Sequence, residues 1–379
     1  MTSNTSRKLK YYTKAEQLPR ISESERSEIE RVTKTFGFRV NDYYLSLINW
    51  DDPDDPIRRI VIPHPRELDR GGAMDPSNEK HYTVLQGLEH KYHSVAVFLV
   101  TDRCDGLCRY CFRKRLFIQP QKQALEDWDA AYRYVEQHPE ITNVLLTGGD
   151  ALMLSTEKLS EVLARLRKID HVGIIRLGTR IPSYNPYRII DDPDLLKLIE
   201  NHSTAQKRLY VMTHFVHPRE LTDVAIEGAA LLQAAGAKLA NQTPLIRGVN
   251  DKPEVLAELL KKLSFAGVIP YYIFQCRPAV GNKAYAVPIE EGYEIVERAK
   301  SMVSGLAKRA RYTMSHATGK IEILGKTKDR VYFKYHRAAK DADSGRFMVF
   351  KSNPAACWLD DYGLPVDDAP ICDRQDITV

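Results

Sequence analysis

Three of the 6 cysteines in this 379-residue chain lie close together, as Cys104, Cys108 and Cys111 in TDRCDGLCRYCFRKR. Three thiolates on one loop cannot complete a tetrahedral zinc site unless a fourth ligand joins them. They can hold three irons of a [4Fe-4S] cluster and leave the fourth iron open to a small molecule with amino and carboxylate groups. The alternatives are a zinc site completed by Cys276 or a histidine, and ordinary buried cysteines. The spacing and the position directly after an apolar run favour the cluster.

The elements that must position this loop follow a repeating pattern. Short apolar, β-rich runs alternate with amphipathic stretches of helical length, which predicts parallel βαβ units. Such folds bind ligands at the carboxyl ends of their strands, where the cysteines, GGD, GTR, THF, NQT and QCR follow the six runs in turn. The runs are Val95–Val100, Asn143–Thr147, Val172–Leu177, Arg208–Thr213, Ala237–Asn241 and Ile269–Phe274, and the predicted helices include Gln123–Glu136, Thr156–Lys168, Asp194–Asn201, Arg219–Ala235, Pro253–Phe265 and Ile289–Lys308.

Six such units predict an α/β fold, a partial (β/α)6 barrel with extensions at both ends. Before it we expect a helix at Glu23–Lys34 and a wrapping segment of turns at Asp51–Lys80, which is rich in Pro, Asp and Arg. After it we expect a hairpin that turns at Gly325–Asp329 and an acidic tail packed on the surface. The expected division is 1–90 for the N-terminal extension and wrapping segment, 91–310 for the barrel, and 311–379 for the C-terminal hairpin and tail.

The composition narrows the setting in which the protein works. The net charge of +5 is small for the length, and no block of Lys and Arg stands out, which argues against a nucleic-acid partner. The polar start MTSNTSRKLKYYTKAEQ lacks the apolar stretch of a signal peptide, and no apolar run has the length of a membrane span. We therefore expect a cytoplasmic protein whose clustered cysteines stay reduced and bind metal or do redox chemistry.

The cysteine loop resembles the cluster motif of the radical S-adenosylmethionine (SAM) enzymes. In that superfamily the cluster reduces the bound sulfonium, which splits to give a 5′-deoxyadenosyl radical that abstracts a hydrogen atom from the substrate. The glycine turn in LLTGGD resembles the turn that binds the amino group of SAM, and its lack of Cβ atoms lets backbone approach a ligand closely. The resemblance implies a partial barrel of the radical SAM type.

A longer series of motifs resembles the lysine 2,3-aminomutase family over roughly residues 38 to 310. These enzymes move an amino group between the α and β carbons of an amino acid, with the amine carried on pyridoxal phosphate (PLP). PLP does the difficult chemistry, while the protein positions it and excludes water and oxygen. The motifs, in order, are YYLSLINWDDPDDPIRRIVIP, LVTDRCDGLCRYCFRKR, VLLTGGDALMLS, LGTRIPSYNPYRI, THFVHPRELT, NQTPLIRGVND and PYYIFQC.

The resemblance assigns roles to individual residues. Arg113 matches the arginine that grips the substrate carboxylate, a task that suits a fixed guanidinium fork. The other matches are Cys104, Cys108 and Cys111 for the cluster, Gly148, Gly149 and Asp150 for the methionine end of SAM, and Arg180, His217 and Gln242 for further SAM contacts.

Two departures from the family concern the substrate. Lysine-specific members have an Asp where this chain has Arg277, and an Asp there would pair with the distal ammonium of the substrate. An Arg repels that ammonium and attracts a carboxylate. A second Asp that precedes the PLP lysine is missing, because the corresponding stretch TMSHATGK contains no acidic residue. Lysine is therefore not expected to be the substrate.

Further departures concern PLP and zinc. Lys320 in HATGKIEILG is the match to the PLP lysine, and burial could lower its pKa enough for a Schiff base. The alternative is a solvated lysine that enters a hairpin. Val95 stands where the family has an arginine and Phe274 where it has a tyrosine, and each change removes a polar contact to PLP. Only Cys357 and Cys372 remain of the C-terminal cysteines that bind structural zinc in the family.

Two enzymatic hypotheses follow, with a small molecule as substrate in both. The first is a PLP-dependent 2,3-aminomutase for a non-cationic amino acid, with glutamate as the leading candidate. Arg113 would hold the α-carboxylate and Arg277 the side-chain carboxylate. The second is a PLP-independent radical SAM enzyme that epimerises, dehydrates or rearranges another acidic compound. A third hypothesis is a structural or sensory iron–sulfur or zinc protein, against which the set of SAM motifs argues. The resemblance also implies a reductant protein such as flavodoxin or ferredoxin, and a homo-oligomer.

Overall fold

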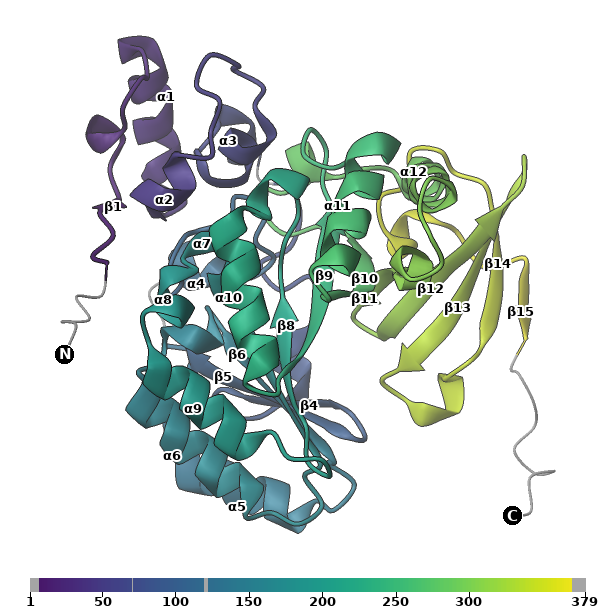
Figure 1. Ribbon diagram of the computed structural model, residues 1–379. Helices are drawn as coiled ribbons and strands as arrows, with labels where there is room; N and C mark the ends of the chain where they lie inside the picture. The colour runs from purple at the N-terminus through teal and green to yellow at the C-terminus, as the bar shows by residue number, and fades with distance from the viewer. Residues whose placement is uncertain (1–6, 70, 119–121, 370–379) are drawn as a thin grey trace.

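The computed structural model describes residues 7–69, 71–118 and 122–369. Within these residues the strands form one 13-stranded sheet and a separate two-stranded sheet. The strands of the large sheet lie in sequence order, from β3 (Thr83–Leu85) at one edge to β15 (Asp367–Ala369) at the other. The sheet is therefore open, and helices cover its outer face (Figure 1).

The six predicted apolar runs form consecutive parallel strands, which confirms the partial α/β barrel expected from the sequence. Side chains alternate between the two faces of each strand. On β7, Ile175 and Leu177 are buried in the core under the helices, whereas Arg176 and Gly178 line a cavity on the concave face. The strand bounds are β5 Val95–Thr101, β6 Asn143–Gly148, β7 Ile174–Gly178, β8 Leu209–Thr213, β9 Lys238–Leu245 and β10 Ile269–Gln275.

The helices that connect these strands begin at the residues that cap them. Asp127 accepts a hydrogen bond from the backbone N–H of Ala130, so the first of these helices starts later than its predicted start at Gln123. The last ends before its predicted end at Lys308, because Val303, Ser304 and Gly305 are poor helix formers. The bounds are α5 Trp128–Gln137, α6 Thr156–Arg167, α9 Pro193–His202, α10 Asp223–Ala234, α11 Pro253–Phe265 and α12 Ile289–Ser301, with the shorter helices α4 Arg115–Ile118, α7 Ile181–Tyr184 and α8 Tyr187–Ile190.

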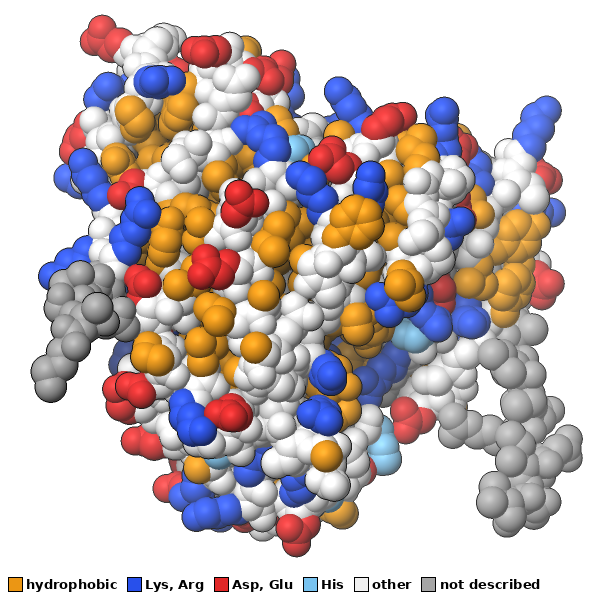
Figure 2. All heavy atoms as spheres, in the orientation of Figure 1, with side chains coloured by type: hydrophobic (Ala, Val, Ile, Leu, Met, Phe, Trp, Pro, Cys, Tyr) orange, Lys and Arg blue, Asp and Glu red, His pale blue; other side chains and the backbone are white. Residues whose placement is uncertain are grey.

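Charged side chains of both signs are interspersed over the helical face of the molecule (Figure 2), in keeping with the small net charge. None of the helices in the described ranges has the length and apolar character that a membrane span requires.

The C-terminal strands continue the barrel sheet. The first of them pairs in parallel with β10, and the following strands pair antiparallel, including the predicted hairpin. The expected boundary at residue 310 therefore lies within one continuous sheet, and the division into three parts stays a prediction. The bounds are β11 Arg311–His316, β12 Gly319–Lys326, β13 Arg330–Ala338 and β14 Phe347–Lys351.

The tail was expected on the surface, and its first part is instead anchored in the core. Trp358 and Tyr362 are buried among core residues, and β15 extends the sheet by pairing with β14. Each of these two aromatic side chains buries a large apolar area, and this burial holds the first part of the tail against the core. Cys372 lies outside the described residues.

The N-terminal region contacts the cysteine loop, and the segment predicted as turns at Asp51–Lys80 contains the short helix α3 (Pro56–Val61). The backbone N–H groups of Leu107 and Arg109 in that loop donate to the carbonyls of Arg39 (2.9 Å) and Ile60 (2.9 Å). The predicted helix is confirmed as α1. The bounds are β1 Tyr11–Tyr12, α1 Glu23–Thr33, β2 Val40–Asn41, α2 Asp42–Leu45, α3 Pro56–Val61 and, between β3 and β5 in the large sheet, β4 Leu88–Tyr92.

Candidate functional site

A cavity of about 370 Å³ opens on the concave face of the sheet. Its wall is built from strands β4 to β13 and from the loops at their carboxyl ends. The structure brings all but one of the predicted site residues to this wall, and the exception is His217. The residues at the wall are Cys104, Cys108, Cys111, Arg113, Gly148, Gly149, Asp150, Arg180, Gln242, Arg277 and Lys320.

The cysteine loop follows β5 and is fixed by the N-terminal region. The Asp105 carboxylate accepts hydrogen bonds from the Tyr11 hydroxyl (2.5 Å) and the Asn41 amide (2.7 Å). The buried Arg109 guanidinium pairs with the Glu67 carboxylate at 2.8 Å. These long-range contacts hold the loop rigidly over the cavity.

The three cysteines fit an iron–sulfur cluster better than one zinc ion. Burial raises the pKa of the Cys104 thiol well above its ordinary value and that of Cys111 to about 11, so their thiolates need a bound cation. Thiolates around a single tetrahedral zinc lie within about 4 Å of one another. Among the described residues, the three sulfurs do not form a group with all its members within 4.8 Å.

The glycine turn after β6 packs against the cysteine loop. Gly148 has a φ of +116°, and a Cβ atom there would lie 2.4 Å from the carbonyl oxygen of Thr101. A Cβ atom on Gly149 would lie 2.2 Å from the carbonyl oxygen of Arg103. The sequence suggested that these glycines admit a ligand, and the structure shows that they also admit the neighbouring backbone.

Asp150 links the loop after β6 to the loop after β7. Its carboxylate accepts from the Thr179 hydroxyl (2.6 Å) and from the backbone N–H of Arg180 (2.6 Å). Burial raises the pKa of the Asp150 carboxyl to about 6. GGD and GTR, which are distant in sequence, therefore form one connected structure.

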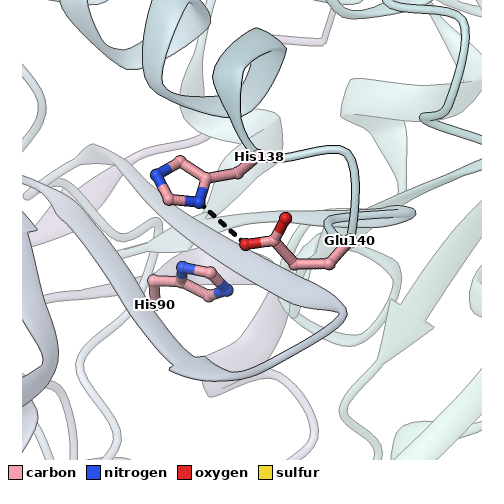
Figure 3. A group of neighbouring side chains, drawn as sticks. All are labelled: His90, His138 and Glu140. Carbon is pink, nitrogen blue, oxygen red and sulfur yellow. Dashed lines mark hydrogen bonds and ion pairs between the residues drawn. The ribbon is translucent and has the colours of Figure 1, made fainter.

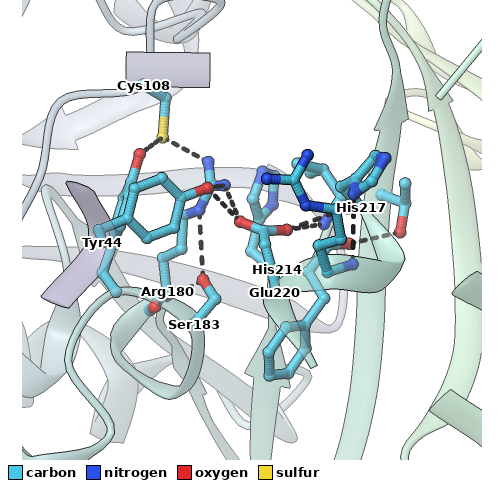
Figure 4. A network of polar contacts seen from close by, with 12 residues as sticks. Tyr44, Cys108, Arg180, Ser183, His214, His217 and Glu220 are labelled. Atoms are coloured by element: carbon cyan, nitrogen blue, oxygen red, sulfur yellow. Dashed lines mark hydrogen bonds and ion pairs between the residues drawn. The ribbon is translucent and has the colours of Figure 1, made fainter. Parts of the chain in front are cut away.

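Arg180 lies at the centre of a buried polar network (Figure 4). Its guanidinium donates to the Cys108 sulfur at 2.8 Å and to the Glu220 carboxylate at 2.5 Å. It also donates to the hydroxyl of Tyr44 (3.2 Å) and contacts that of Tyr110. A fixed positive charge therefore stands beside a predicted cluster ligand.

His217 does not line the cavity. Its Nδ1 accepts a hydrogen bond from the backbone N–H of Arg219 (3.2 Å), which ties it to its own loop. His214 lines the cavity instead, with its Nε2 3.1 Å from the Tyr110 hydroxyl. His214 directly follows β8, so the rule that ligands bind at strand ends could have selected it from the sequence.

Gln242 of β9 also lines the cavity. Its side chain makes no hydrogen bond to the residues that the structure describes, so its amide is free to bind a ligand.

Arg113 is held by carboxylates that the sequence did not single out. Its Nε and Nη2 donate to the two oxygens of Glu79 at 3.1 and 2.8 Å, and Arg115 contacts the same carboxylate. The nearest Glu89 oxygen lies 3.7 Å from Arg113 Nη2 and has no hydrogen-bond partner among the described residues. Both glutamates lie between the first family motif, which ends at Pro63, and the barrel, where the sequence showed no motif.

The buried position of Glu89 predicts that the free energy of unfolding depends on pH. Burial, and then the neighbouring Glu79 carboxylate, raise the pKa of the Glu89 carboxyl to about 7. At low pH the Glu89 carboxyl is neutral in both the folded and the unfolded protein and costs no stability. As the pH rises towards 7 the carboxyl ionises more readily in the unfolded protein, so the free energy of unfolding falls. We expect Glu89→Gln to match the wild type at pH 4 and to be more stable at pH 8 by on the order of 1–3 kcal/mol. Urea unfolding at both pH values measures this difference, and equal stability at pH 8 would contradict it.

The Lys320 amine and the Arg277 guanidinium line the cavity without a carboxylate partner among the described residues. Lys320 Nζ lies over the rings of Tyr272 (4.4 Å) and Phe274 (5.2 Å), and the Arg277 guanidinium lies 3.7 Å from the ring centre of Phe112. Burial, and then nearby guanidinium groups, lower the pKa of the Lys320 amine well below its ordinary value. Neither side chain forms an ion pair with a carboxylate in the described part of the chain.

A separate group of possible metal ligands lies near the amino ends of β5 and β6 (Figure 3). His138 Nδ1 is 2.7 Å from a Glu140 oxygen, and His90 lies beside them. Both nitrogens of His90 already have protein partners, the Tyr134 hydroxyl (2.9 Å) and the His93 carbonyl (3.0 Å). We assign no metal to this group.

Comparison with known proteins places the chain in a family. Residues 98–260 match the radical SAM superfamily. The chain is 54% identical over 357 residues to a protein of Aquifex aeolicus named "Putative L-lysine 2,3-aminomutase", covering 94% of this chain and 96% of that one. It is 37% identical to the L-lysine 2,3-aminomutase of Clostridium subterminale, covering 75% of this chain and 68% of that one. The chain belongs to the lysine 2,3-aminomutase family.

The glutamate 2,3-aminomutase of Clostridioides difficile is a more distant relative, 33% identical over 76% of this chain and 67% of its own length. As a member of the lysine 2,3-aminomutase family, the protein is an isomerase of the aminomutase type. Membership also implies a [4Fe-4S] cluster and SAM, which the thiols and polar groups of the cavity suit.

Proposed function

We propose that this protein is a PLP-dependent 2,3-aminomutase that acts on a non-cationic amino acid, with glutamate the leading candidate. The observation that carries the proposal is the half-buried Lys320, whose amine lines the same cavity as the cysteine loop. Relatives in the family are named as lysine and glutamate 2,3-aminomutases, so either reaction has precedent on this fold.

Lys320 has the surroundings that a lysine needs to bind an aldehyde. An amine attacks a carbonyl only when it is neutral, and burial among cations favours the neutral form. PLP, when bound, carries the substrate amino group and stabilises the radical as that group moves between two carbons. The rings of Tyr272 and Phe274 flank the Lys320 amine at 4.4 and 5.2 Å and give it an apolar contact surface.

The radical would be generated at the other end of the cavity. Cys104, Cys108 and Cys111 would hold the cluster, and Gly148, Gly149, Asp150, Arg180 and Gln242 would contact SAM. We assign the histidine contact to His214, because it lines the cavity and His217 does not.

The charges near the substrate support an acidic amino acid. Arg277 has no carboxylate partner among the described residues, and it is available for the side-chain carboxylate. Arg113 is oriented by Glu79 through Nε and Nη2, which leaves Nη1 for the α-carboxylate. A cationic side chain would meet Arg277 and be repelled.

The proposal extends to partners. A flavodoxin or ferredoxin would supply the electron that the cluster passes to SAM. A homo-oligomer would follow the resemblance to the family.

Arg277→Asp tests the substrate assignment. We expect the KM for glutamate to rise about 10- to 100-fold, because a charge-assisted hydrogen bond is removed and a repulsive charge takes its place. The assay measures conversion of glutamate to β-glutamate and of lysine to β-lysine by anaerobic protein with its cluster, SAM, PLP and dithionite.

Arg309→Asp is the matched control, because Arg309 is exposed and, among the residues that the structure describes, donates only to the backbone of Leu306. The control is expected to keep the wild-type KM. Unchanged glutamate kinetics in Arg277→Asp would remove the assignment of glutamate. Turnover of lysine but not glutamate by the wild type would have the same effect.

A further inference from the structure

The wall around Lys320 carries an excess of positive charge. Four cationic side chains lie near its amine and also line the cavity, namely Lys91, Arg176, Arg277 and Arg337. None of the four forms an ion pair with a carboxylate in the parts of the chain that the structure describes. Uncompensated charges in a half-buried cavity are costly unless a ligand neutralises them. Arg277 is accounted for by the substrate, whereas the others have no assigned role.

Arg176 and Arg337 are held by neutral partners that orient them without cancelling their charge. Arg176 Nε donates to the Asn143 side-chain oxygen at 2.8 Å. Arg337 Nη2 donates to the Ser94 hydroxyl at 2.8 Å, and its guanidinium lies 4.6 Å from the ring centre of Tyr92. Each guanidinium therefore keeps further N–H donors for an anion.

The strand register places Arg337 directly beside Lys320. Lys320 of β12 is opposite Arg337 of β13 on one side and opposite Ser315 of β11 on the other. Residues opposite each other in an antiparallel pair share one face of the sheet, with Cβ atoms about 5 Å apart. A hydroxyl, an amine and a guanidinium thus form a row on the cavity wall, and Arg176 reaches the same cavity from β7.

We propose that Arg176, Arg337 and Ser315 form a phosphomonoester site that holds the phosphate of PLP. Two guanidinium groups match the double negative charge of a phosphate ester, and their forks suit its oxygens. The site would take the place of the arginine that the family has at the position of Val95, whose apolar side chain lies on the cavity wall. This inference rests on the proposed PLP dependence.

The two anion sites lie at different depths of the barrel. Ser94, which holds Arg337, directly precedes β5 at the amino end of the strands, whereas Phe112, under Arg277, lies in the loop that follows β5. The phosphate site is therefore deep in the barrel, and the substrate arginine is close to the cysteine loop. Lys320 lies between them, because its neighbours include both Arg337 and Arg277.

The test compares PLP with pyridoxal, which has the same aldehyde but no phosphate. Anaerobic protein with its cluster is titrated with each compound and reduced with borohydride, and peptide mass spectrometry measures the adduct on Lys320. We expect the wild type to be half-labelled at a much lower concentration of PLP than of pyridoxal. Arg176→Gln and Arg337→Gln should each reduce this preference about 10- to 100-fold, as expected for loss of a charge-assisted hydrogen bond.

Pyridoxal also reports folding, because a variant that still takes pyridoxal onto Lys320 has an intact site. Arg176→Lys and Arg337→Lys are measured alongside, and a preference between those of the wild type and the Gln variants would support a guanidinium role. Arg311→Gln is the matched control, since Arg311 is an exposed arginine of β11 paired with Glu322 at 3.0 Å. It should keep the full preference.

The outcomes separate this inference from the proposed function. Wild-type labelling of Lys320 with an unchanged preference in the arginine variants overturns the phosphate site and leaves PLP dependence intact. Absence of labelling by either compound in the wild type overturns PLP dependence itself. Equal labelling by PLP and pyridoxal, with inorganic phosphate binding that is lost in the variants, would assign the site to free phosphate and overturn its assignment to PLP.

Discussion

Replacing Lys320 with methionine is expected to abolish the borohydride-trapped adduct with PLP at this position and to lower aminomutase turnover on the order of 10³-fold or more. Methionine has a similar length and apolar stem but no amine. The cluster and the SAM contacts lie on other loops, so reductive cleavage of SAM in the absence of substrate should persist. Peptide mass spectrometry and a 5′-deoxyadenosine assay measure the two properties separately.

Lys326→Met is the matched control, because Lys326 lies on the same strand and points to Glu294 at 2.6 Å, outside the cavity. It should retain the adduct at Lys320 and full turnover. An adduct on another lysine, or normal turnover in Lys320→Met, would contradict the assignment. SAM cleavage by wild-type protein that forms no adduct anywhere would favour the PLP-independent hypothesis.

Arg180→Met is expected to lower the free energy of unfolding by about 3–5 kcal/mol, because it leaves the buried Glu220 carboxylate without its cation. Glu220 keeps hydrogen bonds from Tyr44 and from the backbone of Val216, which do not neutralise its charge. The double variant Arg180→Met/Glu220→Gln removes both charges and keeps an acceptor, and it should recover at least half of the loss. Urea unfolding under anaerobic conditions measures all three proteins.

Arg165→Met provides the surface comparison. Arg165 pairs with Asp129 at 3.0 Å, both side chains are exposed, and such pairs contribute about 0–1 kcal/mol. A loss in Arg180→Met no greater than that in Arg165→Met would show that the buried pair is not a stability determinant.

The strands and the cysteine loop could be predicted from the sequence for a simple reason. Buried parallel strands are apolar runs, and residues that follow them meet at one edge of the sheet. This rule located the cysteines, GGD, Arg180 and Gln242 without knowledge of any contact. The same rule predicts a site role for His214, which directly follows β8. The resemblance to the family pointed instead to His217, three residues further along the same motif.

Other parts of the site depend on contacts that no local pattern records. Glu79 lies at the end of a segment of turns and Glu89 on the short strand β4, and only the folded chain shows that they meet Arg113. Arg176 and Arg337 lie within strands, and their importance appears only when the concave face of each strand is known. The tail aromatics Trp358 and Tyr362 follow acidic and Pro-containing sequence, which concealed their burial.

The sequential order of the large sheet has a consequence for biosynthesis. Each strand pairs with the strand made just before it, so the sheet can grow by local addition as the chain leaves the ribosome. The cysteine loop and the glycine turn are made early, whereas Lys320 and Arg337 arrive with the last third of the sheet. Before those strands pair, the cysteine loop that would bind the cluster is already present, but Lys320 and Arg337, which would bind PLP, are not yet in place. If PLP is the organic cofactor, as proposed, the order of synthesis favours loading the metal first.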